Sequence, residues 1–234
     1  MSYRAEYQDI GIRDYKTAWD YQEELFTRLV SEKISQNDNS GGNGEYTPGT
    51  LIFVEHPHVY TLGKNGSEHN LLLDALQLKI KEAGFFRTNR GGDITYHGPG
   101  QVVGYPIFDL NRMGLSLRDY IHCLEEAIIA ALREFGLKGS RLTGATGVWL
   151  DPDIAGRARK ICAIGVKASR YVTMHGFAFN VNTDLSYFGY INPCGFTDKG
   201  VTSLEYELGA AQDIEMVKQI IRKNLQNVFD LTWV

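Results

Sequence analysis

The run Arg90-Gly-Gly-Asp-Ile-Thr-Tyr-His-Gly-Pro-Gly-Gln101 is the most informative stretch of the chain. Five of its twelve residues are glycine or proline. Glycine permits positive φ and close approach of the backbone to a ligand, and proline fixes φ. The run also offers anchoring groups at Arg90, Thr95, Tyr96 and His97. A tight β-hairpin connection with incidental polar side chains is the alternative, and the density of contact groups favours a ligand-binding segment.

The segments on either side of this run have the composition of strands. Residues 85–88 and 101–110 are rich in aromatic and β-branched types, so the run itself is predicted to be a loop between sheet elements. The same criteria predict further strands at residues 50–55, 145–150, 160–168 and 171–182. Helical spacing of apolar residues predicts helices at about 15–34, 74–83, 116–135 and 213–229. Polar or glycine-rich loops are expected at residues 37–44 and 187–199.

The clearest helix is the one predicted for residues 116–135. Ser116 is a good N-cap, Asp119 stands at the capping-box spacing, and Gly136 follows the last turn. Cys123 lies beside the apolar stripe of this helix and is interpreted as a small core residue. The order of helices and strands has no repeating βαβ rhythm, no internal repeat and no visible domain boundary. We therefore expect one α+β domain over residues 1–234, with a mixed β-sheet and flanking helices.

Composition excludes several classes of protein. The 234 residues are 43% hydrophobic, enough for a real core, and a formal net charge of -4 without a basic run gives no case for nucleic-acid binding. The first residues lack the apolar segment of a signal peptide, and no later stretch reaches membrane-spanning length. A cytoplasmic protein is expected, in which the odd number of cysteines, 3, indicates thiols and not a disulfide framework.

A reactive pair is predicted from Cys194 and Lys160. Cys194 stands in Ile191-Asn-Pro-Cys-Gly-Phe196, where Pro193 and Gly195 favour a turn that presents the thiol. Lys160 opens an apolar strand, so partial desolvation weakens its hold on its proton. A nearby cation favours the reactive thiolate. Cys194 and Lys160 are therefore the candidate nucleophile and acid/base.

Cys162 is the competing thiol. It lies two residues after Lys160, and strand alternation predicts that both side chains share a face. Its apolar neighbours indicate a packed site, where thiols are usually inert.

The histidines give weaker indications. His56 and His58 flank Pro57, but no Cys or acidic cluster completes a metal shell, so a metal site is disfavoured. His97 and His175 are each followed by glycine and are candidates to line one pocket. The sequence has neither a Walker-type glycine loop nor a Gly-x-Ser-x-Gly elbow.

Taken together, these segments resemble the lipoyl(octanoyl) transferase family. The resemblance spans most of the chain and rests on four motifs in the family's order: Arg90-Gly-Gly-Asp-Ile-Thr-Tyr-His-Gly-Pro-Gly-Gln101, Lys160-Ile-Cys-Ala-Ile-Gly165, His175-Gly-Phe-Ala-Phe-Asn-Val-Asn182 and Asn192-Pro-Cys-Gly195. It implies the fold shared by biotin and lipoate protein ligases, with Cys194 as nucleophile and Lys160 as the residue that lowers its pKa. It also implies an acyl pocket lined by Arg90, Gly91, Gly92, Asp93, Ile94, Thr95, Tyr96, His97, Ala163, Ile164, Gly165, Gly176, Phe177 and Ala178. No catalytic role is assigned to Asp93.

The implied reaction moves octanoyl from octanoyl-acyl carrier protein to a lysine through a Cys194 thioester, the first step of endogenous protein lipoylation. The implied acceptors are lipoyl domains of 2-oxoacid dehydrogenases and the glycine cleavage H protein. Neither ATP nor another cofactor is needed, because passing from thioester to amide is downhill. The expected partners include no nucleic acid and no membrane, and a monomer is expected.

Two alternatives remain open at the level of sequence. An ATP-dependent lipoate or biotin protein ligase of the same fold also needs a glycine-rich loop and a functional lysine, but it has no need of the cysteine in Asn192-Pro-Cys-Gly195. A noncatalytic acyl-group or carrier-protein binder would bind without turnover.

Overall fold

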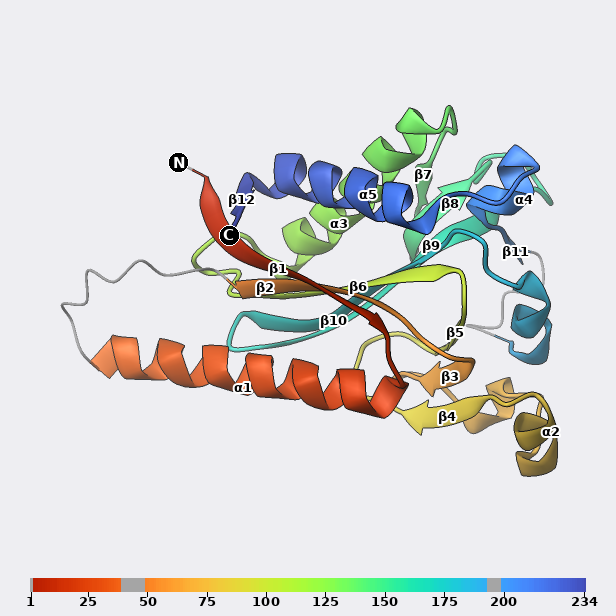
Figure 1. The fold of residues 1–234 in the computed structure, drawn as a ribbon, viewed down its shortest axis with the longest axis horizontal. Coiled ribbons are helices and arrows are strands. Elements are labelled where there is room, and N and C mark those ends of the chain that lie inside the picture. Colours follow the sequence, from red (N-terminus) through yellow and green to blue (C-terminus); the bar gives the residue numbers. More distant parts are fainter. Residues whose placement is uncertain (1, 39–48, 193–198) are drawn as a thin grey trace.

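A nine-stranded mixed sheet with helices on both faces forms the frame of the protein (Figure 1). The computed structural model describes residues 2–38, 49–192 and 199–234. Its helices are α1 (Tyr15–Asp38), η1 (Glu68–Asn70), α2 (Ala75–Ile80), α3 (Leu117–Glu134), η2 (Leu185–Tyr190), α4 (Leu204–Leu208) and α5 (Ile214–Phe229), where η marks a 3-10 helix. Its strands are β1 (Tyr3–Ile12), β2 (Gly49–Glu55), β3 (Val59–Leu62), β4 (Gly84–Arg87), β5 (Ile94–His97), β6 (Gln101–Phe108), β7 (Ser140–Leu142), β8 (Ala145–Leu150), β9 (Arg159–Ser169), β10 (Val172–Asn180), β11 (Gly200–Val201) and β12 (Leu231–Trp233).

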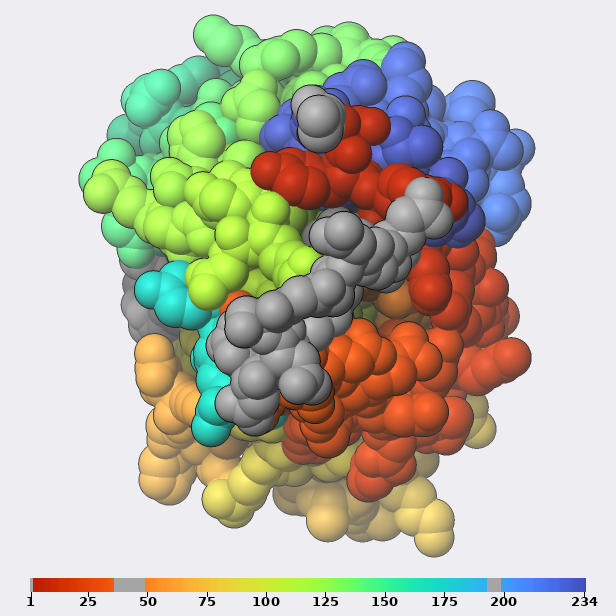
Figure 2. All heavy atoms as spheres, turned by 90° about the vertical axis from the view of Figure 1, so that its left-hand side faces the viewer, coloured from red at the N-terminus to blue at the C-terminus, as the bar shows by residue number. Residues whose placement is uncertain are grey.

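The main sheet has the order β12-β1-β2-β6-β10-β9-β8-β7, and β11 pairs with β9. Strand β1 runs parallel to both β12 and β2, whereas β2, β6, β10, β9, β8 and β7 pair in antiparallel fashion. The first and last strands therefore lie side by side, and Figure 2 shows the red N-terminal residues against the blue C-terminal ones. These observations confirm the predicted α+β class with a mixed sheet.

Alternation along the buried strands divides the core into two layers. In β2, Leu51 and Phe53 join the cluster under α3 and α5, whereas Ile52 and Val54 join the cluster under α1. Period-two alternation explains this division, because successive side chains of a strand point to opposite faces. Figure 1 shows α1 on one face of the sheet and α3 with α5 on the other.

The capping signals in the sequence set the ends of the helices. Ser116 and Asp119 form the predicted capping box of α3, and Gly136 follows the helix with φ +73. Asp213 caps α5, and Asp74 caps α2. Helix α2 is shorter than predicted and ends at Ile80, with left-handed backbone at Glu82.

A second, three-stranded sheet corrects the prediction for the glycine-rich run. Residues Ile94–His97, predicted to be loop, form β5, which pairs with β3, and β3 pairs with β4. Tyr60, Leu62, Ile94, Tyr96 and Ile191 form the core of this sheet. The run is therefore a turn, a short buried strand and a second turn.

Two further predictions change, and several strands were missed. The loop expected at 37–44 begins later, because residues 37 and 38 still belong to α1, and residues 39–44 lie outside the described residues. The loop expected at 187–199 contains the end of η2, and its residues 193–198 are likewise not described. Strands β1, β3, β7, β11 and β12 were not predicted from the sequence. In the described part of the chain, no helix is long and apolar enough to cross a membrane.

Candidate active site

A cavity of about 520 Å³ opens where the two sheets meet. Its walls come from the glycine-rich run at residues 90–95, from β8 and β9, from β10, and from the residues of and around η2 and β11. Of the predicted site residues it contacts Arg90, Gly92, Asp93, Ile94, Thr95, Lys160, Ala163, Ile164 and Ala178. Segments far apart in the sequence, including three of the four motifs, therefore line one space.

Lys160 lies on the wall of this cavity near the start of β9. Its Nζ lies 4.6 Å from the centroid of the Trp149 ring, a cation–π contact with the neighbouring strand. The backbone of Lys160 pairs with Val201 of β11, and its carbonyl accepts from the N–H of Thr202 at 2.9 Å. The sheet therefore fixes the lysine backbone, and its partly buried side chain faces the cavity.

Cys194 lies outside the described residues, within 193–198. On one side of that stretch, Ile191 lines the cavity, and the N–H of Asn192 donates to the carbonyl of Asn70 at 2.8 Å. On the other side, Lys199 lines the same cavity. Both described ends of the stretch therefore lie at the cavity that contains Lys160.

The side chain of Cys162 lies in the core, whereas that of Lys160 lines the cavity. The prediction that both share one face of the strand is therefore wrong. Opposite β9, the register of β8 shifts between Val148 and Trp149, which pair with Cys162 and Lys160 respectively. An irregularity of this kind breaks strict alternation. Cys162 is completely buried in the core under α3 and α5, where burial raises the pKa of its thiol well above the usual range. It is a packed thiol, as its apolar neighbours indicated.

The turn at residues 90–92 is held by hydrogen bonds of the Arg90 side chain and of the Gly91 N–H. The Arg90 guanidinium is buried and donates to the Thr61 carbonyl at 2.6 Å and to the Thr61 hydroxyl at 3.0 Å. The N–H of Gly91 donates to the Val166 carbonyl at 2.9 Å, and Gly92 has φ +84. The guanidinium donors of Arg90 therefore hold the cavity wall in shape.

A smaller chamber of about 50 Å³ adjoins the cavity and shares five of its lining residues, among them Thr95 and Ala178. His97 and His175 both line it, which confirms the prediction that they meet at one pocket. Gly165, Gly176 and Phe177 complete the predicted residues found here. Burial lowers the pKa of His97 and of His175 to about 3, so both imidazoles are neutral near pH 7.

Two predicted pocket residues line neither space. Tyr96 is fully buried in the core of the small sheet, and its hydroxyl lies 2.7 Å from Nδ1 of His58. Gly91 contributes its N–H to the neighbouring strand and does not face the cavity.

Several lining residues were not predicted from the sequence. Trp149, Leu185, Phe188 and Ile191 give the cavity much of its apolar surface, and Asn180 adds an amide. The one signal in the sequence was the aromatic and glycine content of the predicted loop at 187–199, which contains Phe188 and Ile191. In the ranges that the structure describes, no group of three or more His, Cys, Asp or Glu side chains is arranged to hold a metal ion.

Comparison with known proteins gives a consistent result. The model of the lipoyl protein ligase A/B catalytic domain family matches residues 14–226. An octanoyltransferase of Parabacteroides distasonis is 54% identical over 223 residues, which cover 95% of this chain and 97% of that protein. An octanoyltransferase of Christiangramia forsetii is 52% identical and covers 98% of this chain and 97% of that protein.

Solved structures support the fold. A bi-partite lipoate protein ligase from Thermoplasma acidophilum superposes with a TM-score of 0.72 at 13% identity, covering 99% of this chain and 86% of that one. Lipoate-protein ligase A bound with ATP superposes with a TM-score of 0.68 at 14% identity, covering 100% of this chain and 88% of that one. At these identities the likeness concerns the fold alone.

Proposed function

The chain belongs to the family of lipoyl protein ligase A/B catalytic domains, and we propose that it is an octanoyltransferase. In this proposal it moves an octanoyl group from octanoyl-acyl carrier protein to a lysine of a lipoyl domain. The observation that carries the proposal is the cavity that brings Lys160 together with the residues on both sides of the Cys194 segment. The octanoyltransferase relatives, more than half identical over nearly the whole chain, support the same reaction.

The first half of the proposed reaction acylates the enzyme. The Cys194 thiolate attacks the thioester carbon of the donor, a C–S bond forms to Cys194, and the C–S bond to the carrier thiol breaks. Protonated Lys160 gives its proton to the departing thiolate and becomes neutral. The ammonium also stabilises the thiolate before attack, because a nearby cation lowers the pKa of a thiol.

The second half transfers the acyl group to the acceptor. Neutral Lys160 takes a proton from the amine of the acceptor lysine, the amine attacks the Cys194 thioester, and an amide leaves as Cys194 returns to a thiolate. In both halves an oxyanion forms, and we assign its stabilisation to backbone N–H groups of the glycine-rich turns. One well-placed donor contributes roughly 3 kcal/mol.

The proposed acyl pocket is the cavity together with its adjoining chamber. Apolar side chains such as Ile94, Ile164 and Phe188 line the cavity, and burial of hydrocarbon on such surfaces favours binding. The proposed acceptors include lipoyl domains of 2-oxoacid dehydrogenases and the glycine cleavage H protein. A cytoplasmic location and a monomeric state remain predictions from the sequence.

A ligase reaction is the second candidate, because the solved ligases share the fold. The two reactions differ in what they require: a ligase forms an adenylate from a free acid and ATP, whereas the transferase uses a ready-made thioester.

The test is a pair of transfer assays on the purified full chain with a lipoyl domain as acceptor. One reaction contains octanoyl-acyl carrier protein without ATP, and the other contains octanoic acid with ATP and Mg²⁺. We expect octanoylated lipoyl domain, detected by intact mass, in the first reaction only. Product in the second reaction only would establish a ligase, and product in neither would leave a noncatalytic binder; both results reject the proposal.

A further inference from the structure

The backbone of His175 is strained in the interior of β10. Its φ is +60, a left-handed conformation that non-glycine residues seldom adopt and that clusters at functional positions. The other described non-glycine residues with positive φ, such as Arg170 and Tyr171, lie in turns or next to the ends of elements. We therefore ask which contacts of the His175 side chain depend on this strained backbone.

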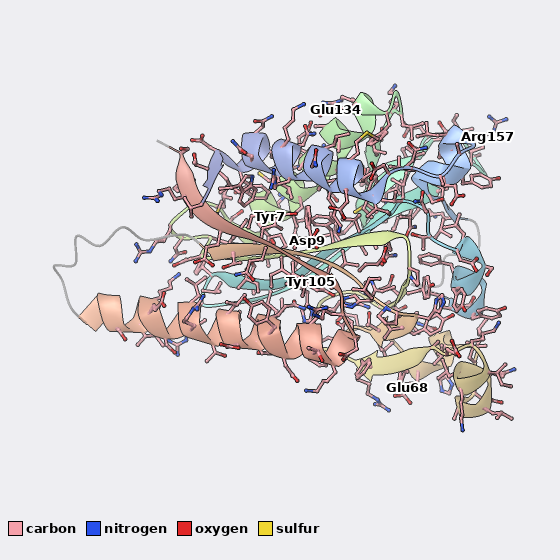
Figure 3. All side chains as sticks on the ribbon, in the orientation of Figure 1. Tyr7, Asp9, Glu68, Tyr105, Glu134 and Arg157 are labelled. Atoms are coloured by element: carbon pink, nitrogen blue, oxygen red, sulfur yellow. The ribbon has the colours of Figure 1, made fainter. Side chains whose placement is uncertain are left out.

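The neighbouring strand and α1 hold this conformation in place. Opposite this part of β10, β6 contains Pro106, which has no N–H, and the regular β6–β10 pairing ends at Phe177 and Gly104. The N–H of His175 instead donates to Oε1 of Gln22, a buried residue of α1, at 3.1 Å. Tyr105 of β6, labelled in Figure 3, packs in the cluster between the sheet and α1. The carbonyl of Pro106 accepts from the Thr173 hydroxyl at 2.9 Å, and a side chain of α1 supplies the acceptor for the His175 N–H.

The imidazole that this conformation presents is used to hold Asn89. Nε2 of His175 lies 2.7 Å from Oδ1 of Asn89, and Nδ2 of Asn89 donates to Oε1 of Glu23 at 3.1 Å. Because the carboxylate of Glu23 fixes the amide nitrogen as donor, Oδ1 of Asn89 accepts and Nε2 of His175 carries the proton. His175 is 1% exposed, and burial lowers its pKa to about 3. It is therefore a neutral imidazole in a fixed tautomer.

Asn89 immediately precedes the turn at residues 90–92, which forms a wall of the cavity. The chain of contacts thus runs from α1 through His175 to Asn89 and into the turn. We propose that His175 is a positioning residue: its imidazole holds Asn89, and through Asn89 it fixes the turn at residues 90–92 so that the acyl group lies in register with the reacting atoms. The expected effect on transfer kinetics rests on the proposed function, whereas the expected effect on the order of the turn does not.

The test uses variants that separate the imidazole from the backbone strain. His175→Gly accepts φ +60 without cost and removes the imidazole, and Asn89→Ala removes the acceptor. Tyr171→Gly is the matched control, because Tyr171 also has a positive φ, +64, but is exposed and lines neither the chamber nor the cavity. His175→Asn, which tolerates the left-handed conformation and is shorter, replaces His175→Gly where that variant does not fold.

We expect His175→Gly and Asn89→Ala each to lower kcat for transfer about 10- to 100-fold, as expected for a reacting group misplaced by about 1 Å. KM should stay within about threefold in Asn89→Ala, since Asn89 lines neither the cavity nor the chamber. The double variant should lose no more than the worse single variant, because both changes break one chain of contacts. Tyr171→Gly should match the wild type.

A second measurement is independent of turnover. The amide of Gly91 donates to Val166, and its hydrogen exchange should quicken in His175→Gly and Asn89→Ala but not in Tyr171→Gly. Wild-type kcat in His175→Gly, additive losses in the double variant, or unchanged exchange at Gly91 would each overturn the positioning role. An inactive wild type would instead count against the proposed function, and the exchange measurement would still decide the inference.

Discussion

Acidification from pH 7 to pH 5 should destabilise the folded protein strongly, because three histidines are buried in neutral form. Burial lowers the pKa of His56 from 6.5 to about 4, and it lowers the pKa values of His97 and His175 from 6.5 to about 3. Below the unfolded-state pKa the unfolded chain binds protons that the folded chain does not. Stability is therefore lost as pH falls through about 6.5, and the loss continues until the folded-state pKa values are reached.

The magnitude follows from linkage. One proton of difference between the two states changes the free energy of unfolding by about 1.4 kcal/mol per pH unit. Integrated from pH 7 to pH 5, each histidine accounts for about 2 kcal/mol, and the three together for about 5 to 6 kcal/mol. A typical domain has only about 5–15 kcal/mol in total, so we expect most of its stability to disappear over this range.

Urea denaturation at pH 7, 6 and 5 measures this dependence, and His56→Gln provides the internal check. The variant removes one of the three buried groups, so its slope of unfolding free energy against pH near pH 5 should be about two-thirds of the wild-type slope. The comparison of slopes holds even though the variant also loses the contacts of His56 with the Arg13 carbonyl and the Tyr105 hydroxyl. A flat free energy of unfolding between pH 7 and 5, or equal slopes in the two proteins, would show that the buried histidines do not set this pH dependence.

Three further predictions concern packing around the site. In Gly176→Ala the new Cβ would lie 2.1 Å from the carbonyl oxygen of Gly104. Because the backbone cannot move aside easily, we expect the free energy of unfolding, measured by thermal or urea denaturation, to fall by about 1–3 kcal/mol. An unchanged midpoint would contradict the close contact between the two strands. Tyr96→Phe removes the hydroxyl contact with His58 and should cost about 1 kcal/mol while transfer kinetics stay unchanged, because Tyr96 faces the core of the small sheet. Cys162→Ala should keep full transfer activity, since that thiol is buried and its pKa is raised; loss of acylation without loss of folding would make Cys162 the nucleophile.

The elements that could be predicted are those whose signals are local. The capping box of Ser116 and Asp119, and the glycine after α3, fix that helix within the residues that form it. The apolar spacing of α5 does the same for residues 213–229. In contrast, β1 is polar along much of its length, and its partners β12 and β2 lie elsewhere in the chain. A strand that forms by pairing with distant segments has no clear pattern in its own residues from which it could be predicted.

The same distinction applies to the site. The motifs brought Lys160, Thr95 and Ala178 into the predicted set, and the structure places all three at one cavity. The apolar neighbours of Cys162 predicted its burial, but its separation from Lys160 was not predictable, because it depends on a register shift between β8 and β9. Nor was the left-handed backbone of His175, which arises where β6 offers a proline.

To test the thioester mechanism, the purified chain is mixed with octanoyl-acyl carrier protein, without acceptor or ATP, and its intact mass is measured before peptide mapping. We expect one octanoyl group per chain, carried by the peptide that contains Cys194, and much slower formation of this adduct in Lys160→Met. Absence of the adduct in the wild type, or its location on the Cys162 peptide, would rule out Cys194 as the nucleophile.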